Sequence, residues 1–309
     1  MEVLTMGRVG VDLYPEQSGV PLAAVRSFAK SLGGTATNVA VGAARLGRRA
    51  AVITKVGDDG FGPYVRDALA GFGVDARFVG THPTLRTPIV FCELNPPDDP
   101  PLLFYRAPTA PDMTVTTDEL DIEAIAEVPL FWVTGSLFSA EPARSGAFAA
   151  LDARGRRRHT VFDLDWRPMF WADPDEATAL YRKALAQVTV AVGNQAEVRV
   201  AVGTDDPGTA ADELLALGVD LAVVKRGRDG VLLASADDRV TVPPIGIDVV
   251  CALGAGDAFG AALGHGLLSG WDLERIGRYA NAAGAIVASR LACADAMPTT
   301  AEIQELLAR

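Results

Sequence analysis

The stretch Gly254-Ala-Gly-Asp257-Ala-Phe259 opens an Ala- and Gly-rich run with a helical pattern that continues through Gly266. Small residues at a helix N-terminus let successive backbone N–H groups converge on one point, where the helix dipole also favours negative charge. An aspartate in the fourth position can reach whatever group approaches an anion bound there. The stretch therefore indicates phosphoryl transfer, although the same residues also fit an ordinary helix cap.

The composition is that of a globular protein. The chain has 309 residues, of which 49% are hydrophobic and 22% are charged, enough for one large α/β domain and an accessory part. It contains no apolar run of the roughly 20 residues that a membrane span needs, and residues 1–30 lack the pattern of a secretory signal. We therefore expect a cytoplasmic protein.

Charge and cysteine content argue against several classes of protein. The net charge of −11 disfavours binding to nucleic acid or to a membrane surface, because both need clustered lysine and arginine. The three cysteines are an odd number without metal-ligand spacing, which disfavours a disulfide scaffold and a zinc site. Reduced cysteines fit a cytosolic protein.

Short β-branched runs alternate with helical patterns along most of the chain. Strands are expected at residues 51–56, 130–134, 160–164, 188–192 and 221–225. Helices are expected from about Phe61, Glu141 and Pro174, and then at 255–268, at 272–290 and from Thr299. This alternation predicts an α/β protein with a mostly parallel sheet that helices cover on both faces.

Two segments break this rhythm, at residues 13–34 and 80–106. They predict a small β element, such as a lid, attached to a body formed by residues 1–12, 35–79 and 107–309. A lid would exclude water from a bound phosphoryl donor. An edge hairpin explains the same pattern.

Two motifs near the N-terminus could bind sugar hydroxyls. Gly33 and Gly34 permit a tight turn with close approach of the backbone to a ligand, and Asn38 lies one helical turn later. Asp12 follows a first strand, at the edge where open parallel sheets bind ligands. A plain loop and a surface aspartate explain the same residues, so neither motif is decisive alone.

A third motif, Asp163-Leu-Asp165-Trp-Arg167, directly follows an expected strand. The guanidinium of Arg167 could hold a carboxylate or a phosphate in a bidentate grip. Alternatively, Asp165 and Arg167 simply pair with each other.

Two further motifs could serve a nucleotide. Asn194 and Glu197 would present an amide and a carboxylate at a helix start, as hydrated Mg²⁺ near phosphates requires, although the spacing also fits a capping box. The basic turn from Lys225 through Gly227 to Gly230 could hold phosphates, or could be a hairpin with solvated charges. The sequence has no P-loop, complete G-x-G-x-x-G or G-x-S-x-G motif, which disfavours the corresponding enzyme classes.

The order of the motifs resembles that of the ribokinase-like (PfkB-type) sugar kinases over essentially the whole chain. The motifs are Asp12, Gly33-Gly34 with Asn38, Gly57-Asp58-Asp59-Gly60-Phe61-Gly62, Asn194-x-x-Glu197, Lys225-x-Gly227 and Gly254-Ala-Gly-Asp257. Each motif is weak alone, but six in order are specific. The resemblance implies a three-layer α/β/α body with a mostly parallel sheet and a small β-sheet lid, which often forms a homodimer.

The resemblance also implies roles for individual residues. Asp257 would take the proton from the substrate hydroxyl, and Gly254, Ala255 and Gly256 would form the anion hole for the γ-phosphoryl group of ATP. The implied cofactor-binding residues are Asn194, Lys225, Gly227, Gly230 and Asn281, with Glu197 at hydrated Mg²⁺, and the implied sugar-binding residues are Asp12, Gly33, Gly34 and Asn38. We expect Asp257 to stay ionised without a raised pKa, because a helix N-terminus favours its charge.

Within the family, the chain most resembles the branch that phosphorylates the C6 hydroxyl of 5-dehydro-2-deoxygluconate in inositol catabolism. The supporting stretches are residues 7–13, 27–34, 103–106, 161–168 and 295–299. A keto-acid substrate would explain Arg106 and Arg167, because a carboxylate needs a cation. The alternatives are a 2-keto-3-deoxygluconate kinase, another sugar kinase such as a fructokinase or ribokinase, and a non-catalytic sensor.

One departure from the family pattern precedes the anion hole. Many relatives have Asp-Thr-Thr where this chain has Cys251-Ala252-Leu253. The missing carboxylate and hydroxyls could contact Mg²⁺, phosphate or a monovalent cation, so activation by K⁺ is doubtful here.

Overall fold

The computed structural model describes residues 1–17, 19–98, 100–173 and 175–309. Its main feature is a nine-stranded sheet with the order β13-β12-β11-β10-β9-β8-β1-β4-β5. The strands of this sheet are β1 (Val3–Met6), β4 (Ala50–Gly57), β5 (Val79–His82), β8 (Leu130–Thr134), β9 (Thr160–Asp163), β10 (Val190–Asn194), β11 (Leu221–Lys225), β12 (Val231–Ala234) and β13 (Arg239–Val242). All neighbouring strands from β11 to β5 pair in parallel, whereas β12 and β13 form an antiparallel edge.

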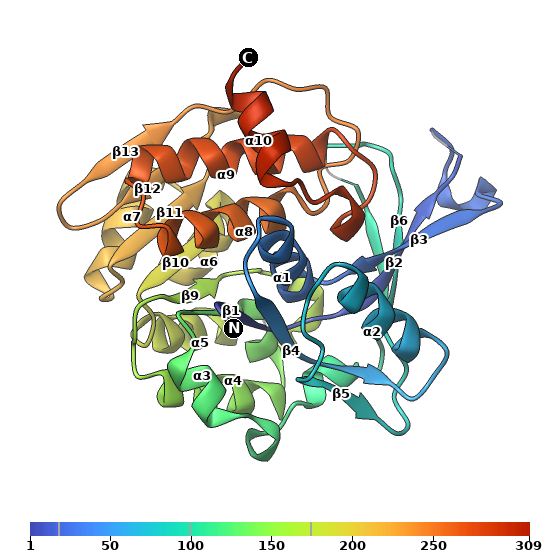
Figure 1. Ribbon diagram of the computed structural model, residues 1–309. Helices are drawn as coiled ribbons and strands as arrows, with labels where there is room; N and C mark the ends of the chain where they lie inside the picture. The colour runs from blue at the N-terminus through green and yellow to red at the C-terminus, as the bar shows by residue number, and fades with distance from the viewer. Residues whose placement is uncertain (18, 99, 174) are drawn as a thin grey trace.

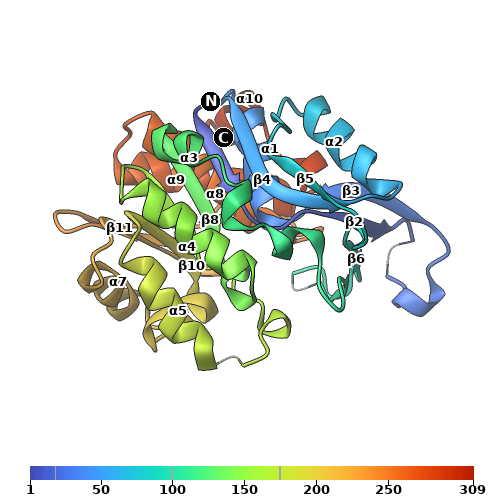
Figure 2. The same cartoon turned by 90° about the horizontal axis from the view of Figure 1, so that it is seen from below.

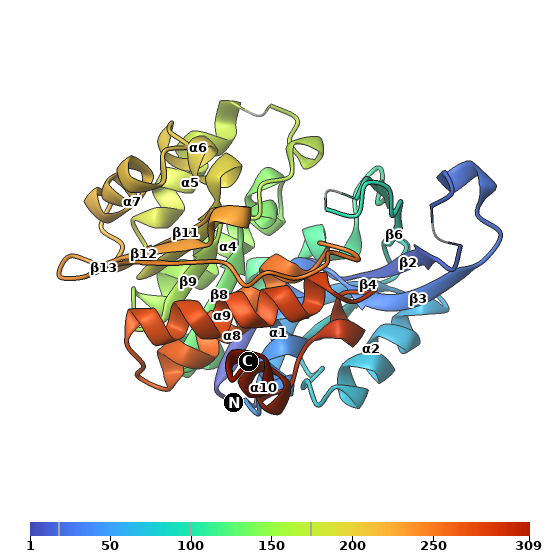
Figure 3. The ribbon, with the colours of Figure 1, turned by 90° about the horizontal axis from the view of Figure 1, so that it is seen from above.

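Helices cover both faces of the large sheet, as Figures 2 and 3 show. One face carries α1 (Thr35–Arg45), α2 (Phe61–Gly71), α8 (Ala255–Leu268), α9 (Leu273–Ala288) and α10 (Thr300–Leu307). The other face carries α3 (Ile122–Glu127), α4 (Ala143–Arg154), α5 (Asp175–Leu185), α6 (Gln195–Val202) and α7 (Pro207–Ala216). The expected three-layer α/β/α fold with a mostly parallel sheet is confirmed.

The strands are hydrophobic on both faces because each face packs against a helical layer. Leu130 and Trp132 of β8 enter the core beneath α1 and α8, whereas Phe131 and Val133 enter the core beneath α3 to α7. Successive side chains of a strand point to opposite faces, so a strand buried on both sides appears as a continuous apolar run. The expected strands at 130–134 and 221–225 match β8 and β11 at both ends. The helix expected from about Pro174 is α5, and Pro174 itself lies outside the described residues.

A second, four-stranded sheet extends to one side of the body (Figure 1). Its order is β3-β2-β6-β7, with β2 (Gly10–Pro15), β3 (Phe28–Gly33), β6 (Ile89–Cys92) and β7 (Leu102–Tyr105). Much of this sheet falls within the irregular segments 13–34 and 80–106, but β2 begins earlier, and β5, most of which lies within 80–106, belongs to the large sheet. The division of the chain into a body and a lid domain stays a prediction. Within the described residues, no helix is long and apolar enough to cross a membrane.

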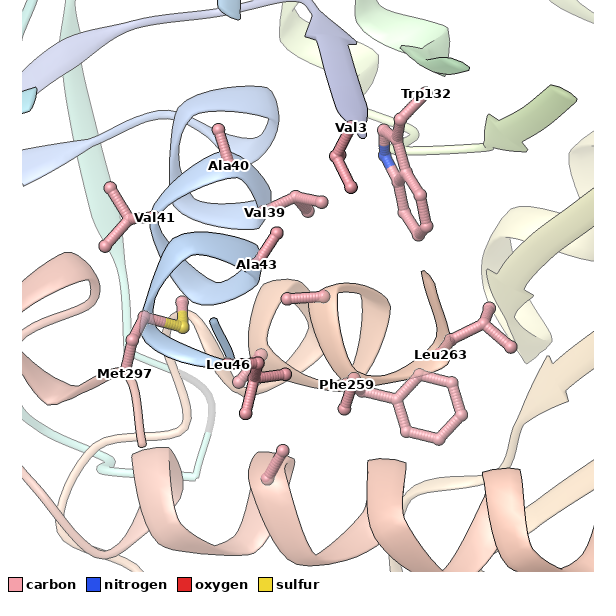
Figure 4. Close-up of a cluster of buried hydrophobic side chains, with 14 of the residues drawn as sticks. Val3, Val39, Ala40, Val41, Ala43, Leu46, Trp132, Phe259, Leu263 and Met297 are labelled. Carbon is pink, nitrogen blue, oxygen red and sulfur yellow. The ribbon is translucent and has the colours of Figure 1, made fainter. Parts of the chain in front are cut away.

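Helix α8, which follows the Gly254 turn, approaches the sheet closely because of a glycine. A Cβ atom at Gly260 would lie 2.7 Å from the indole ring of Trp132, so only a residue without a side chain fits there. Gly42 of α1 is similarly close to Ala261 of α8. Figure 4 shows α1, α8 and Trp132 around this shared core. The small residues thus set the distance between the sheet and the start of α8.

We expect Gly260→Ala to destabilise the protein by about 1–3 kcal/mol, the usual range for overpacking a core. Thermal or urea unfolding of the two proteins measures this change. The matched control is Gly264→Ala one turn later, where the nearest atoms to the added methyl group would be the terminal carbons of Leu130, at 3.3 Å or more. An equal loss of stability in both variants would show that the contact with Trp132 does not set the position of α8.

Candidate active site at the carboxyl edge of the sheet

One cavity of about 320 Å³ lies where the large sheet meets the small one. Because β1, β9, β10 and β11 are parallel, the residues that follow or end these strands meet at a single edge. Most predicted site residues line this cavity: Asp12, Gly34, Asn38, Arg106, Arg167, Asn194, Glu197, Lys225, Gly254, Gly256 and Asp257. Residues more than 200 positions apart in the sequence are thereby brought together.

The Gly254 turn lines the cavity at the N-terminus of α8. Gly254 is the N-cap with a φ of 84°, and a Cβ atom there would lie 2.8 Å from the sulfur of Cys293. A residue with a side chain would therefore be strained and would also clash. Asp257 caps no backbone group of α8, so it is not the ordinary helix cap that the sequence also allowed. Its Oδ2 atom instead accepts a 2.7 Å hydrogen bond from Nδ2 of Asn38.

The expectation that Asp257 has no raised pKa was wrong. Burial in the cavity wall raises the pKa of Asp257 to about 6, and the hydrogen bond from Asn38 only partly opposes this effect. Desolvation by the surrounding protein therefore outweighs the favourable field of the helix N-terminus. Asp257 is still mostly ionised at neutral pH, which a general base requires.

On the sugar side, Asp12 of β2 faces the cavity and is almost fully buried. Burial raises its pKa to about 7, although the positive charge of Arg8 lowers it. Gly33 does not line the cavity, but it lies directly behind the Asp12 carboxylate, where any Cβ atom would clash. Gly34 has a φ of 102° and packs against the backbone of Arg8, so both glycines are required by close approach of the chain to itself.

Arg8 is a cavity residue that the sequence reasoning missed. It is only 5% exposed, and its guanidinium donates to both carboxylate oxygens of Asp165 at 3.0 Å and to Thr35 at 2.6 Å. Arg8 lies close to Asp12 in the sequence, but nothing in the neighbouring residues distinguishes it from a surface arginine. Its burial becomes clear only from its hydrogen bonds to Asp165, which is 157 residues away.

The two predicted arginines, Arg106 and Arg167, differ in how far protein carboxylates already pair with their guanidinium groups. Arg106 forms an ion pair of 2.6 Å with the buried carboxylate of Asp112. Arg167 lies 3.4 Å from Asp165, so the pairing that the sequence allowed is present, but its buried Nε atom has no hydrogen-bond partner among the described residues. Because Arg8 already engages both oxygens of Asp165, Arg167 is the less satisfied of the two predicted cations.

Asn194 and Glu197 form a reciprocal capping box at the start of α6. The backbone N–H of Asn194 donates to Oε2 of Glu197 at 2.6 Å, and the N–H of Glu197 donates to Oδ1 of Asn194 at 2.9 Å. Both side chains still line the cavity. In the described part of the chain, no group of three acidic, His or Cys side chains forms a metal cage. Mg²⁺ beside phosphates usually needs only one or two carboxylates, so Glu197 fits that use.

Lys225 ends β11 and extends toward the Gly254 turn. Its ammonium group lies 3.9 Å from Oε2 of Glu197. Asp163, at the end of β9, also lines the cavity, and burial raises its pKa to about 8 although Lys225 lowers it. Asp163 belongs to the third sequence motif, but no role was predicted for it.

Four other predicted residues do not line this cavity: Ala255, Gly227, Gly230 and Asn281. Gly227 has open space around it, whereas Gly230 packs so tightly on Val242 that no Cβ atom fits. Asn281 of α9 donates a 2.8 Å hydrogen bond to the carbonyl oxygen of Pro243. The predicted contacts of these residues with a nucleotide stay predictions.

Two curated proteins of the same name are similar to this chain over nearly its whole length. The chain is 30% identical to a 5-dehydro-2-deoxygluconokinase of Geobacillus kaustophilus over 99% of this chain and 93% of the relative. It is 32% identical to a protein of the same name from Photobacterium profundum over 97% of this chain and 92% of the relative.

Solved structures show the same fold. An uncharacterised sugar kinase of Pyrococcus horikoshii, solved in complex with ATP, superposes with a TM-score of 0.82 at 26% identity, covering 98% of this chain and 99% of that one. A putative ribokinase of Escherichia coli, solved with ATP and Mg²⁺, has a TM-score of 0.91 at 24% identity, covering 100% and 99%. The family of pfkB carbohydrate kinases matches residues 2–300. The chain therefore belongs to the PfkB family of carbohydrate kinases and is an enzyme of that class.

Proposed function

We propose that this kinase transfers the γ-phosphoryl group of ATP to the C6 hydroxyl of 5-dehydro-2-deoxy-D-gluconate, a step of myo-inositol catabolism. The observation that carries this proposal is the position of Arg167, which lines the same cavity as Asp257 and the Gly254 turn. A cation near the base suits a substrate that has a carboxylate at one end and a reactive hydroxyl at the other. The full-length relatives of that name support the same substrate.

The reaction places Asp257 beside the attacking hydroxyl. The C6 oxygen forms a bond to the γ-phosphorus while the bond from that phosphorus to the β,γ-bridging oxygen breaks, and ADP leaves. The hydroxyl proton passes to Asp257. Because the transition state of such a transfer is loose, positioning and charge stabilisation account for most of the catalysis.

The cofactors are ATP and Mg²⁺. Gly254 and Gly256 line the cavity at the N-terminus of α8, which suits the γ-phosphoryl group, whereas the N–H of Ala255 donates to the carbonyl oxygen of Ala252 at 3.2 Å. Glu197 would hold the hydrated Mg²⁺ that neutralises the phosphates, with Asn194 beside it. The turn from Gly227 to Gly230, together with Asn281, would bind the rest of the nucleotide.

The substrate carboxylate would be held at the arginine-lined wall of the cavity. Arg8 and Arg106 are engaged by the carboxylates of Asp165 and Asp112. The Nε atom of Arg167 has no hydrogen-bond partner among the described residues, so a substrate carboxylate can accept from this side chain. Asp12 and Asn38 line the same cavity, where they can bond to hydroxyls of the sugar chain.

Three accompanying features are proposed with the function. Leu103 and Tyr105 are exposed on β7, which supports a homodimer formed through the small sheet. The cytoplasm is the proposed location. We expect no K⁺ requirement, because buried Cys251 and half-buried Leu253 replace the polar residues that precede the anion hole in many relatives.

The proposed substrate predicts an order of preference. With ATP and Mg²⁺, 5-dehydro-2-deoxygluconate should give the highest kcat/KM among four candidates, followed by 2-keto-3-deoxygluconate, with fructose and ribose far lower. Coupled assay of ADP release measures all four. A preference for 2-keto-3-deoxygluconate would assign the enzyme to that alternative, and a preference for a neutral sugar would contradict recognition of a carboxylate.

The raised pKa of Asp257 predicts the pH dependence of turnover. The base must be ionised, so kcat/KM should fall as the pH drops through about 6 and level off above it. The hydrogen bond from Asn38 favours the ionised form, so Asn38→Ala should raise the pKa of Asp257 and move the midpoint to higher pH. Initial rates between pH 5 and 8 measure both midpoints.

The control for this experiment is Asp257→Asn, which keeps the shape of the side chain but cannot accept the proton. It should lose about 10²–10⁴-fold in kcat, the usual contribution of a general base, with little change in nucleotide affinity. Near-normal turnover of this variant, or an unchanged midpoint in Asn38→Ala, would contradict the assignment of Asp257 as the base.

Loss of the Arg167 guanidinium should weaken binding of acidic sugars specifically. Arg167→Ala should raise the KM for the sugar acid by about 10–100-fold, since a hydrogen bond to a charged group contributes about 1.5–3 kcal/mol. Activity on a neutral sugar should hardly change. The control is Arg199→Ala, which removes an exposed arginine of α6 outside the cavity. Equal losses on acidic and neutral sugars would place Arg167 at the phosphates.

A further inference from the structure

The side chain of Lys225 points at the backbone of the anion hole. A Cβ atom built on Gly256 would lie 3.3 Å from the Nζ atom of Lys225, so the ammonium group stands directly over the turn that begins α8. The same side chain lines the cavity together with Gly254 and Asp257. Lys225 is thus close to the place where an anion would meet the N–H groups of the turn.

The N–H donors of the Lys225 ammonium group have no hydrogen-bond acceptor among the described residues. Within the described ranges it makes no hydrogen bond, and Oε2 of Glu197, at 3.9 Å, is beyond hydrogen-bonding distance. That oxygen already accepts a hydrogen bond from the backbone of Asn194. Three N–H bonds therefore remain available for a ligand.

The charges around Lys225 keep it protonated. The groups that face it are Glu197 of α6, Asp163 of β9, Asp257 of α8 and Arg167 beyond β9. A lysine side chain is protonated in the neutral range, and the facing carboxylates of Glu197, Asp163 and Asp257 favour its positive charge.

The residues before the turn bring no charge of their own. Cys251 is buried, and Leu253 packs with the cluster formed by Tyr14, Cys92, Cys251 and Cys293. The sulfur of Cys293 lies directly behind Gly254. An apolar, thiol-lined wall thus supports the anion hole on one side, and Lys225 places a positive charge next to Gly256.

We propose that Lys225 is a further catalytic residue, whose ammonium group binds the transferring phosphoryl group and stabilises the negative charge of its oxygens in the transition state. The inference rests on the proposed phosphoryl transfer and goes beyond a contact between Lys225 and the nucleotide. Backbone N–H groups would approach the phosphoryl oxygens from α8, and the ammonium group from β11. Charge placed in advance at a site that excludes water needs no reorganisation during the reaction.

The test separates turnover from nucleotide binding. In Lys225→Met, kcat should fall by about 10²–10³-fold, the range for losing one donor to a developing negative charge, while the KM for ATP changes by less than about threefold. Lys225→Arg keeps the charge and should turn over faster than Lys225→Met. The control is Lys183→Met, which removes the same charge from an exposed position on α5.

A second measurement needs no sugar and therefore stands apart from the choice of substrate. With Mg²⁺, aluminium fluoride mimics the phosphoryl group in transfer and should tighten ADP binding to the wild type and to Lys183→Met. Lys225→Met should lose most of this tightening while it binds ADP alone normally. This result would support the role of Lys225 even if the preferred sugar differs from the one proposed.

Two results would overturn the inference. A Lys225→Met protein with weaker ATP binding but unchanged kcat would make Lys225 a nucleotide contact only. A Lys225→Arg protein that keeps the wild-type melting temperature but turns over no faster than Lys225→Met would show that the positive charge is not what matters.

Discussion

Parallel pairing of the central strands is the constraint on which the site depends. Strands β1, β8, β9, β10 and β11 all run in one direction, so the residues at their carboxyl ends share one edge. Four of these strands, β1, β9, β10 and β11, end in or are followed by a polar side chain that lines the cavity: Arg8, Asp163, Asn194 and Lys225. The helices complete the site by their N-termini, because α1, α6 and α8 all begin at the same edge.

Burial of charge is the second organising feature. Carboxylates and cationic side chains line the cavity together, and the pKa values of the carboxylates diverge according to their partners. Asp165 is held ionised by Arg8 and Arg167 despite its burial, whereas burial raises the pKa of Asp12, Asp163 and Asp257. Groups of the same chemical type thus differ in how readily they ionise, which suits them to different roles. The low net exposure of the site also strengthens each charge interaction within it.

The α/β class and most of the central strands were predictable from the sequence, because both depend on local pattern. The motifs and their order can be read from the sequence directly. Continuous apolar runs such as 130–134, in alternation with helical patterns, indicate strands buried on both faces, and the glycines at 34 and 254 permit the turns with positive φ that the structure has there. The pKa of Asp257 was not predictable in this way. Its value depends on how much protein surrounds the carboxylate, and that protein comes from segments distant in sequence.

The surroundings of the cations Arg8 and Lys225 were likewise not predictable from the sequence. The sequence by itself determined which residues carry charge and which turns can approach a phosphate, since composition and glycine positions fix these properties. Only the tertiary structure decided that Arg8 is buried against Asp165 and that Lys225 stands over Gly256. The physical reason is that charge interactions act through space, and the sheet brings together side chains that the chain itself keeps far apart.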